Sequence, residues 1–293
     1  MRINENIAIS TPKVLLVPYD AHLVGRYHEW MQNDELREAT ASDLLTLDEE
    51  YENQQSWRVA SDKLTFILCK PVQPDADEAA SERYDMPTVY AGEVDMPSRM
   101  IGDVNLFLTP CDDEMENIAV EEETDEADEK NTCCYCKGEI DIMIAAPETR
   151  RKGIGKAAVR ALLQFLAKNY DAIMSEYSAG LLPSPHPSSP DAVPTPASDG
   201  HGEGGGGAGT KANAPKARLA KLVAKVHAEN VGSIRLFEQL NFRQDGGPNY
   251  FNEVQLVLPW DVPTPEWAPA LAFQESNSYG YREAAYDRSR LTK

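Results

Sequence analysis

The sequence contains no run of 18 or more apolar residues, about the length that a helix needs to cross a bilayer. Its first residues, MRINENIAISTPK, also lack the apolar core of a secretory signal peptide. We therefore expect neither a membrane span nor secretion. The expected compartment is the cytoplasm, with the nucleus as the alternative.

Positively charged residues are scarce. Lysine and arginine number 28 against 48 aspartates and glutamates, which gives a formal net charge of -20 at pH 7. Because nucleic-acid backbones attract basic surfaces, this balance argues against a nucleic-acid partner. Much of the negative charge lies in CDDEMENIAVEEETDEADEK, residues 111–130, which we interpret as a solvated acidic loop. Recruitment of a basic partner is the alternative interpretation of this segment.

Cysteine is infrequent, and its number is odd. Five cysteines are compatible with a reducing compartment and require no disulfide. They are Cys69, Cys111, Cys133, Cys134 and Cys136. Three of them form the stretch CCYC, but no histidine is nearby to complete a zinc ligand set. We therefore expect no metal site and interpret this stretch as the start of a strand.

Three segments have too few large apolar residues to contribute to a core. Residues 71–87 are polar, residues 111–132 are acidic, and residues 178–217 are rich in proline, glycine, serine and alanine. We expect the last of these to be disordered. The cost of closing a loop grows slowly with its length, so these inserts are compatible with one domain over residues 1–258. Residues 259–293 are expected to form a loose polar tail.

Hydrophobic periodicity predicts the ordered elements between these segments. The expected helices cover residues 21–36, 46–61, 155–169 and 230–240. The expected strands cover residues 13–20, 63–70, 100–108, 138–146, 221–226, 241–244 and 250–258. The second helix begins with Thr46 and Glu49 at the spacing of a capping box. In the strand 138–146, three isoleucines alternate with Glu139, Asp141 and Met143, so the two sets lie on opposite faces.

A glycine turn connects that strand to the helix that follows. ETRRKGIGKAA, residues 148–158, places Gly153 and Gly155 behind Arg150, Arg151 and Lys152. Glycines at the amino end of a helix let a phosphate approach the free backbone N–H groups, and the cations add charge. The turn lacks the third glycine of the dinucleotide fingerprint and the Lys-Ser/Thr pair of the P-loop. A glycine turn that only starts a helix is the alternative.

The pattern Arg150-x-x-Gly153-x-Gly155 resembles the pyrophosphate loop of the GCN5-related N-acetyltransferase (GNAT) superfamily. Downstream, AKVHAENVGSIRLFEQLNF (224–242) is similar to that superfamily's strand, Asn-initiated helix and closing segment. Four stretches together resemble the eukaryotic N-acetyltransferase 9-like family: GDVNLFL, EIDIMIAAPETRRKGIG, NVGSIRLFEQLNF and FNEVQLVL. The resemblance covers residues 1–70, 88–108, 137–170 and 218–258.

The resemblance implies a single GNAT domain of α/β class, with a mixed, mostly antiparallel twisted sheet flanked by helices and splayed at the acetyl-CoA site. It implies acetyl-CoA as donor and a primary amine of a protein or peptide, α-amino or lysine, as acceptor. It also implies that the amine attacks directly in a ternary complex, without an acyl-enzyme. The alternative is a fold retained to bind acetyl-CoA or a partner protein without turnover. A small-molecule amine acetyltransferase is a weaker third option.

The resemblance also implies a set of cofactor-binding residues. The backbone N–H groups from Arg151 to Lys156 would bind the pyrophosphate, and Asn230 would contact the pantetheine arm. Capping of the following helix is the alternative role of Asn230. The implied set is Ile144, Arg150, Arg151, Lys152, Gly153, Ile154, Gly155, Lys156, Asn230 and Phe237.

Attack by an amine requires a neutral nucleophile, so a base is expected near the acceptor. We predict Glu139, which precedes Arg150 by the spacing that the catalytic glutamate has in histone-acetylating members of the superfamily. Asp141, on the same strand face, is the alternative base. A solvent-facing carboxylate with no catalytic role is the third interpretation.

One position departs from the superfamily pattern. Many members have a tyrosine that protonates the leaving thiolate, whereas this sequence has Phe237, which has no proton to donate. Ser233 or a water molecule would have to substitute. The alternatives are a first-turn helix residue for Ser233 and a buried core residue for Phe237.

Overall fold

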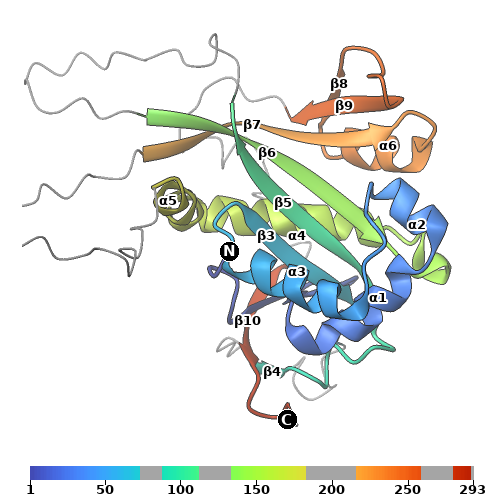
Figure 1. Cartoon of the computed structure of the whole chain (residues 1–293), viewed down its shortest axis with the longest axis vertical. Coiled ribbons are helices and arrows are strands. Elements are labelled where there is room, and N and C mark those ends of the chain that lie inside the picture. Colours follow the sequence, from blue (N-terminus) through green and yellow to red (C-terminus); the bar gives the residue numbers. More distant parts are fainter. Residues whose placement is uncertain (73–87, 112–132, 183–215, 259–279, 292–293) are drawn as a thin grey trace, which may run out of the picture.

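The computed structural model describes residues 1–72, 88–111, 133–182, 216–258 and 280–291. These residues form one sheet of ten strands in the order β4-β10-β1-β2-β3-β5-β6-β7-β9-β8, with helices on both faces (Figure 1). Neighbouring strands are antiparallel except for the pairs β10–β4 and β6–β7. The expected mixed, mostly antiparallel sheet is confirmed.

The strands are β1 (Ile7–Ser10), β2 (Leu15–Pro18), β3 (Lys63–Cys69), β4 (Thr88–Tyr90), β5 (Met100–Pro110), β6 (Cys133–Ile144), β7 (Lys216–His227), β8 (Arg243–Asp245), β9 (Glu253–Leu258) and β10 (Arg282–Asp287). The helices are η1 (Ala21–Leu23), α1 (Val24–Met31), α2 (Asp34–Ala39), α3 (Leu47–Val59), η3 (Pro147–Thr149), α4 (Ile154–Lys168), α5 (Tyr170–Gly180) and α6 (Val231–Glu238). No helix among the described residues is long and apolar enough to cross a membrane.

Strands β5 and β6 present different residues to the two faces of the sheet. We call one side the apolar face, where Val104, Leu106, Leu108 and Ile140 join a core with α4, α5 and α6. The opposite side, which we call the polar face, carries Asp103, Asn105 and Phe107 of β5 and Glu139, Asp141 and Met143 of β6. The predicted alternation along β6 follows from this arrangement.

Helix α4 covers the apolar face. Its amphipathic sequence buries Leu162, Leu163 and Phe165 completely. The Phe165 ring packs edge-on against Phe66 of β3, with ring centroids 5.4 Å apart. The predicted helix 155–169 therefore corresponds to α4 to within one residue at each end.

Helices η1, α1 and α3 cover the polar face, in front of the strands in Figure 1. The prediction of one continuous helix over residues 21–36 was wrong, because the helical conformation is interrupted between α1 and α2. Asn33 is extended there, and its side chain accepts a hydrogen bond from the N–H of Leu36. The predicted capping box is confirmed: Thr46 and Glu49 satisfy each other's backbone N–H groups at the start of α3.

Strands β6 and β7 separate toward their carboxyl ends. They run parallel and are paired from Cys133–Lys216 to Glu139–Val223, the last pair between these two described strands. Beyond it, β6 continues beside β5 and β7 continues beside β9. Figure 1 shows the two ribbons diverging toward α6 and α2. The expected splay in the sheet lies at Glu139 and beyond.

The prediction of a loose C-terminal tail was wrong for residues 280–291. Strand β10 lies between β1 and β4, and its Ala284 and Tyr286 are buried. Arg288 beyond it pairs with Asp20 at 2.6 Å. The sequence signal was weak because β10 is short and its partners are distant along the chain.

The predicted boundaries of the insert 178–217 were also too wide. Helix α5, which was not predicted, continues to Gly180, and β7 begins at Lys216 instead of residue 221. Buried Ser178 accepts a hydrogen bond from the N–H of Ala217 through its Oγ, at 2.9 Å. Most of the three predicted inserts and residues 259–279 of the predicted tail lie outside the described residues.

Candidate active site

The glycine turn follows the carboxyl end of β6, where the sheet is splayed. Gly153 is the residue that precedes the first turn of α4, and its φ of 75° lies in the left-handed region that glycine adopts without strain. Arg151 is also left-handed, with a φ of 62°, a conformation that costs a non-glycine residue about 1–3 kcal/mol. The turn therefore holds an uncommon backbone conformation.

This conformation leaves backbone donors available. No turn, loop or cap hydrogen bond of the described residues is donated by the N–H groups of residues 151–156. The N–H groups of a first helical turn lie at the positive end of the helix dipole. The turn fits an anion such as a diphosphate, as the sequence predicts.

The two glycines have different roles. A Cβ on Gly155 would lie 2.7 Å from Leu236 Cδ1 of α6, so Gly155 permits close packing of α4 against α6. This contact gives Gly155 a packing role, and its expected part in phosphate binding stays a prediction. A Cβ on Gly153 would lie 2.9 Å from Lys13 Nζ, in the turn between β1 and β2. Lys13 adds a cation beside the glycine turn, and sequence reasoning missed it because nothing local connects it to Gly153.

The cations of the turn differ in their contacts. Arg150 Nε donates to the carbonyl oxygen of Ile144 at 3.0 Å, which fastens the turn to the end of β6. Lys156 Nζ donates to Gln239 Oε1 at 3.2 Å, which joins α4 to the end of α6. Two further cations have exposed side chains: Arg151 and Lys152.

Asn230 begins helix α6. Its side-chain oxygen accepts a hydrogen bond from the N–H of Ser233 at 3.1 Å, so the capping role is confirmed. Ser233 lies in the first turn of α6 and is half-buried. Helix α6 lies beside the glycine turn, because Leu236 packs at Gly155 and Gln239 accepts a hydrogen bond from Lys156.

Phe237 lies in the core. It is 1% exposed, and its ring packs against Phe242 with centroids 5.1 Å apart. The structure therefore places this side chain away from any open surface of the described residues. The core interpretation of Phe237 is confirmed, and the expected contact of its ring with the cofactor stays a prediction.

The two candidate bases on β6 have different surroundings. Glu139 Oε2 forms an ion pair with Lys225 Nζ of β7 at 2.8 Å, across the start of the splay. This bond raises the pKa of Lys225. The Glu139 carboxylate is therefore held in an ion pair with Lys225.

Asp141 is half-buried further into the splay. Burial, followed by the nearby negative charges of Glu139 and Asp103, raises the pKa of Asp141 to about 7, and Lys225 opposes this effect. A carboxyl group with a pKa near neutrality can exchange protons under physiological conditions.

A second buried carboxyl group lies on the polar face. Asp103 Oδ2 accepts hydrogen bonds from Tyr27 OH and from Asn105 Nδ2, both at 3.1 Å. Burial raises the pKa of Asp103 to about 6, although these hydrogen bonds lower it. Sequence reasoning missed this group, although the alternation in GDVNLFL already placed Asp103 and Asn105 together on one face.

Residues 13–243 match the family model described as an acetyltransferase (GNAT) domain. The chain belongs to this GNAT family. It is 34% identical over 265 residues to the N-acetyltransferase 9-like protein of Schizosaccharomyces pombe, which covers 88% of this chain and 98% of that relative. It is 31% identical over 268 residues to the Homo sapiens alpha/beta-tubulin-N-acetyltransferase 9, which covers 91% of this chain and 90% of that relative.

Among solved structures, Arabidopsis thaliana NAA60 in complex with acetyl-CoA is similar with a TM-score of 0.41 and 12% identity, over 83% of this chain and 97% of that one. The family match and the relatives confirm the resemblance to the N-acetyltransferase 9-like family. This GNAT protein is an acyltransferase, and acetyl-CoA is its co-substrate. The free N–H groups and cations of the glycine turn fit the diphosphate of that co-substrate.

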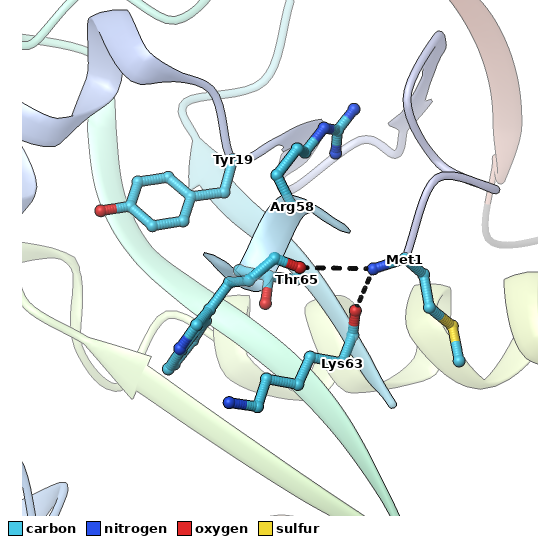
Figure 2. A pocket seen from close by; sticks show the side chains of 6 residues that line it. Met1, Tyr19, Arg58, Lys63 and Thr65 are labelled. Atoms are coloured by element: carbon cyan, nitrogen blue, oxygen red, sulfur yellow. Dashed lines mark hydrogen bonds between the residues drawn. The ribbon is translucent and has the colours of Figure 1, made fainter. Parts of the chain in front are cut away.

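A pocket among the described residues lies under α3, away from the glycine turn. It is lined by Met1, Tyr19, Trp57, Arg58, Lys63 and Thr65. Figure 2 shows the Met1 amino group donating hydrogen bonds to main-chain oxygens, those of Trp57 and Lys63. No carboxyl group lines this pocket. We therefore place the candidate active site at the splay, where Asp141 and the glycine turn share the end of β6.

Proposed function

We propose that this GNAT enzyme transfers the acetyl group of acetyl-CoA to a primary amine of a protein, by direct attack in a ternary complex. The observation that carries the proposal is the position of Asp141. It lies three residues before the end of β6, on the polar face, and the glycine turn follows that strand. The proposed base for the amine thus lies on β6, and the turn proposed to bind the donor follows the same strand.

Asp141, rather than Glu139, is the proposed base. Glu139 is ion-paired with Lys225, so protonating it would break that pair and leave the cation without its partner. Asp141 has a pKa raised to about 7 by burial and neighbouring negative charge. It can therefore accept the proton of an ammonium group near neutral pH and leave the amine ready to attack.

The raised pKa also bears on the kind of amine. An α-ammonium group has a pKa of about 8, and a lysine side chain has one of about 10.4. Proton transfer to Asp141 is therefore less unfavourable from an α-amine, and we propose an α-amine as the preferred acceptor, with lysine as the second. Because relatives are named alpha/beta-tubulin-N-acetyltransferase 9, tubulin is the first protein to test as the source of that amine.

On the donor side, the backbone N–H groups of residues 151–156 would bind the diphosphate, with Lys13 and the exposed Arg151 and Lys152 adding positive charge. Acetyl-CoA supplies the activated thioester. Asn230 would hold the start of α6 beside this site through its cap. Because Phe237 is buried and has no hydroxyl, the Ser233 hydroxyl or water would protonate the leaving sulfur.

The proposal is tested by acetyl transfer from acetyl-CoA to a panel of peptides. The panel should contain tubulin amino-terminal peptides with free and blocked α-amines, and matched lysine peptides. Product on peptides with a free α-amine is the expected result. Saturable binding of acetyl-CoA with no product on any peptide would instead support the binding-only alternative.

The donor site is tested separately by calorimetry with Gly153→Glu. The new side chain would bring negative charge to the turn and would strain a left-handed residue, so affinity for acetyl-CoA should be lost. Gly246→Glu is a matched control, because Gly246 is also left-handed (φ 76°) and has open space around it in the hairpin between β8 and β9. Unchanged affinity in a folded Gly153→Glu protein would exclude the turn as the donor site.

A further inference from the structure

Asn105 is a buried carboxamide whose oxygen is unused. It lies on β5 directly opposite Asp141 of β6, on the polar face. Asn105 is 5% exposed, and its Oδ1 has no hydrogen-bond partner among the described residues. A buried acceptor without a donor is unfavourable in a folded protein, so such an atom points to a ligand or to ordered water.

The orientation of this carboxamide is fixed by its neighbours. Asn105 Nδ2 donates to Asp103 Oδ2, and the same oxygen accepts a hydrogen bond from Tyr27 OH. Because an ionised carboxylate can only accept, the nitrogen of Asn105 must face Asp103 and its oxygen must face away. Asp103 is 3% exposed, so water does not compete for these bonds. The fold therefore holds an acceptor atom in place next to the proposed base.

We propose that Asn105 Oδ1 accepts a hydrogen bond from the acceptor amine while Asp141 receives its proton. Directly opposite residues of an antiparallel pair have Cβ atoms about 4.5–5.5 Å apart, so one nitrogen can contact both side chains. An ammonium group has three N–H bonds. One proton moves to Asp141, one N–H remains bound to Asn105, and the freed electron pair attacks the thioester carbonyl. As the C–N bond forms, the C–S bond breaks and coenzyme A leaves as a thiolate, and the second proton that the nitrogen loses passes to that sulfur.

Asp103 and Tyr27 act as positioning residues in this arrangement, because they act through Asn105 and do not touch the amine. The inference rests on the proposed function, with Asp141 as base. It adds a second contact to the acceptor amine and explains why a polar cluster is buried under α1 and α3. Asn105 would favour amines that still have an N–H group to donate after one proton has moved to Asp141.

The test compares Asn105→Ala with the parent, using the panel peptide that the parent acetylates fastest. Loss of a hydrogen bond to a charged group should lower kcat/KM for the peptide about 10- to 100-fold. The KM for acetyl-CoA should stay unchanged, because Asn105 lies on the acceptor side. A folded Asn105→Ala enzyme whose kcat/KM for the peptide equals that of the parent would overturn the inference.

Tyr27→Phe provides a milder variant, which decides the question if Asn105→Ala does not fold. It keeps the ring and removes the hydroxyl that holds Asp103, so kcat/KM for the peptide should fall about 2- to 10-fold. Tyr281→Phe is the matched control, because Tyr281 OH donates to Glu283 Oε1 at 2.7 Å on β10. The control should keep both KM values and kcat, and equal behaviour of the two variants would contradict a positioning role for Tyr27.

The result also separates this inference from the proposed function. If the parent acetylates no peptide, the proposed function fails and Asn105 has no amine to bind. If the parent is active and Asn105→Ala and Tyr27→Phe match it, only the role of Asn105 is overturned. In that case ordered water would satisfy the Asn105 oxygen.

Discussion

The two faces of strands β5 and β6 are built from alternate residues of the same segments, yet they differ in chemistry. On the apolar face, Leu106 and Ile140 are buried in a continuous hydrophobic core with α4. On the polar face, Asp103 and Asn105 are almost as fully buried. Burial alone therefore does not distinguish a structural core from a candidate site.

The distinction lies in the energetic consequence of burial. Removing aliphatic side chains from water stabilises the fold, by about 25 cal/mol for each square ångström of apolar surface. Removing carboxyl groups from water is unfavourable, and at Asp103 and Asp141 it raises the pKa values. Burial of these carboxyl groups destabilises the fold, so their presence on one face indicates that they take part in the reaction. Substitutions on the two faces should accordingly affect different measured quantities.

The largest effect is expected on the polar face, from Asp141→Asn. This change keeps the shape and removes the proton acceptor, so kcat should fall about 100- to 10,000-fold while affinity for acetyl-CoA stays the same. Parent activity should rise with pH through about 7, as Asp141 loses its proton, and the variant should lack this rise. Steady-state rates from pH 6 to 9 measure both, and a parent-like rate at each pH would exclude Asp141 as base.

The same variant tests the energetic side of the comparison. The pKa of Asp141 is raised in the folded state, so the protonated group favours folding. Its contribution is present below the ordinary pKa of aspartate, about 4, and is lost as pH rises through about 7. Relative to Asp141→Asn, the parent should therefore lose unfolding free energy between pH 4 and 7. Parallel stability curves for the two proteins, obtained by urea unfolding, would contradict the raised pKa.

On the apolar face, Leu106→Ala should act through stability. Leu106 is completely buried, and a leucine-to-alanine change in such a position costs about 2–5 kcal/mol of unfolding free energy. Because Leu106 points away from the polar face, the fraction that remains folded should keep the kcat of the parent. Denaturant unfolding and active-site-normalised rates check this pair of expectations. A large loss of kcat in the folded enzyme would show that the two faces are not independent.

Phe237→Tyr sharpens the comparison within the hydrophobic core. Phe237 is 1% exposed, so the added hydroxyl would be buried without a designed partner and should cost about 1–3 kcal/mol. We expect a lower melting temperature and no gain in turnover, because the hydroxyl cannot reach an open site. A stable variant that turns over faster than the parent would instead place this position beside the leaving thiolate.

The smallest effect is expected from Glu139→Gln. The negative charge of Glu139 raises the pKa of Asp141, so its removal should move the pH midpoint of turnover downward. Lys225, freed from its ion pair, would act in the same direction. The rate above pH 8 should remain within about tenfold of the parent, since the base itself is intact. Loss of turnover across the whole pH range would restore Glu139 as the base that the sequence favoured.

Several features were predictable because local interactions determine them. The capping box of Thr46 and Glu49 depends on residues three apart, and the alternation along β6 depends on the two-residue repeat of a strand. The glycine turn after β6 was equally local, since Gly153 needs a left-handed backbone. Family resemblance then supplied the architecture, a mixed and mostly antiparallel sheet splayed at the cofactor site, which periodicity alone does not give.

Other features were missed because their partners are distant in sequence. Strand β10 has little apolar content of its own and is stabilised by pairing with β1 and β4. The space beside Gly155 is filled by Leu236 of another helix, and Lys13 reaches Gly153 from the turn between β1 and β2. Single-sequence patterns contain no information on such contacts.

The sequence by itself determined that β6 carries two carboxyl groups on one face and is followed by a glycine turn and a helix, because strand and helix periodicities act over a few residues. Only the tertiary structure distinguishes the surroundings of the two carboxyl groups, on which the proposed choice of base rests. Lys225 holds Glu139 in an ion pair, whereas burial, followed by the negative charges of Glu139 and Asp103, raises the pKa of Asp141. Asp103 lies on β5 and Lys225 on β7. Their electrostatic effects depend on distances in space, and these distances are set only when the strands pair in the folded sheet.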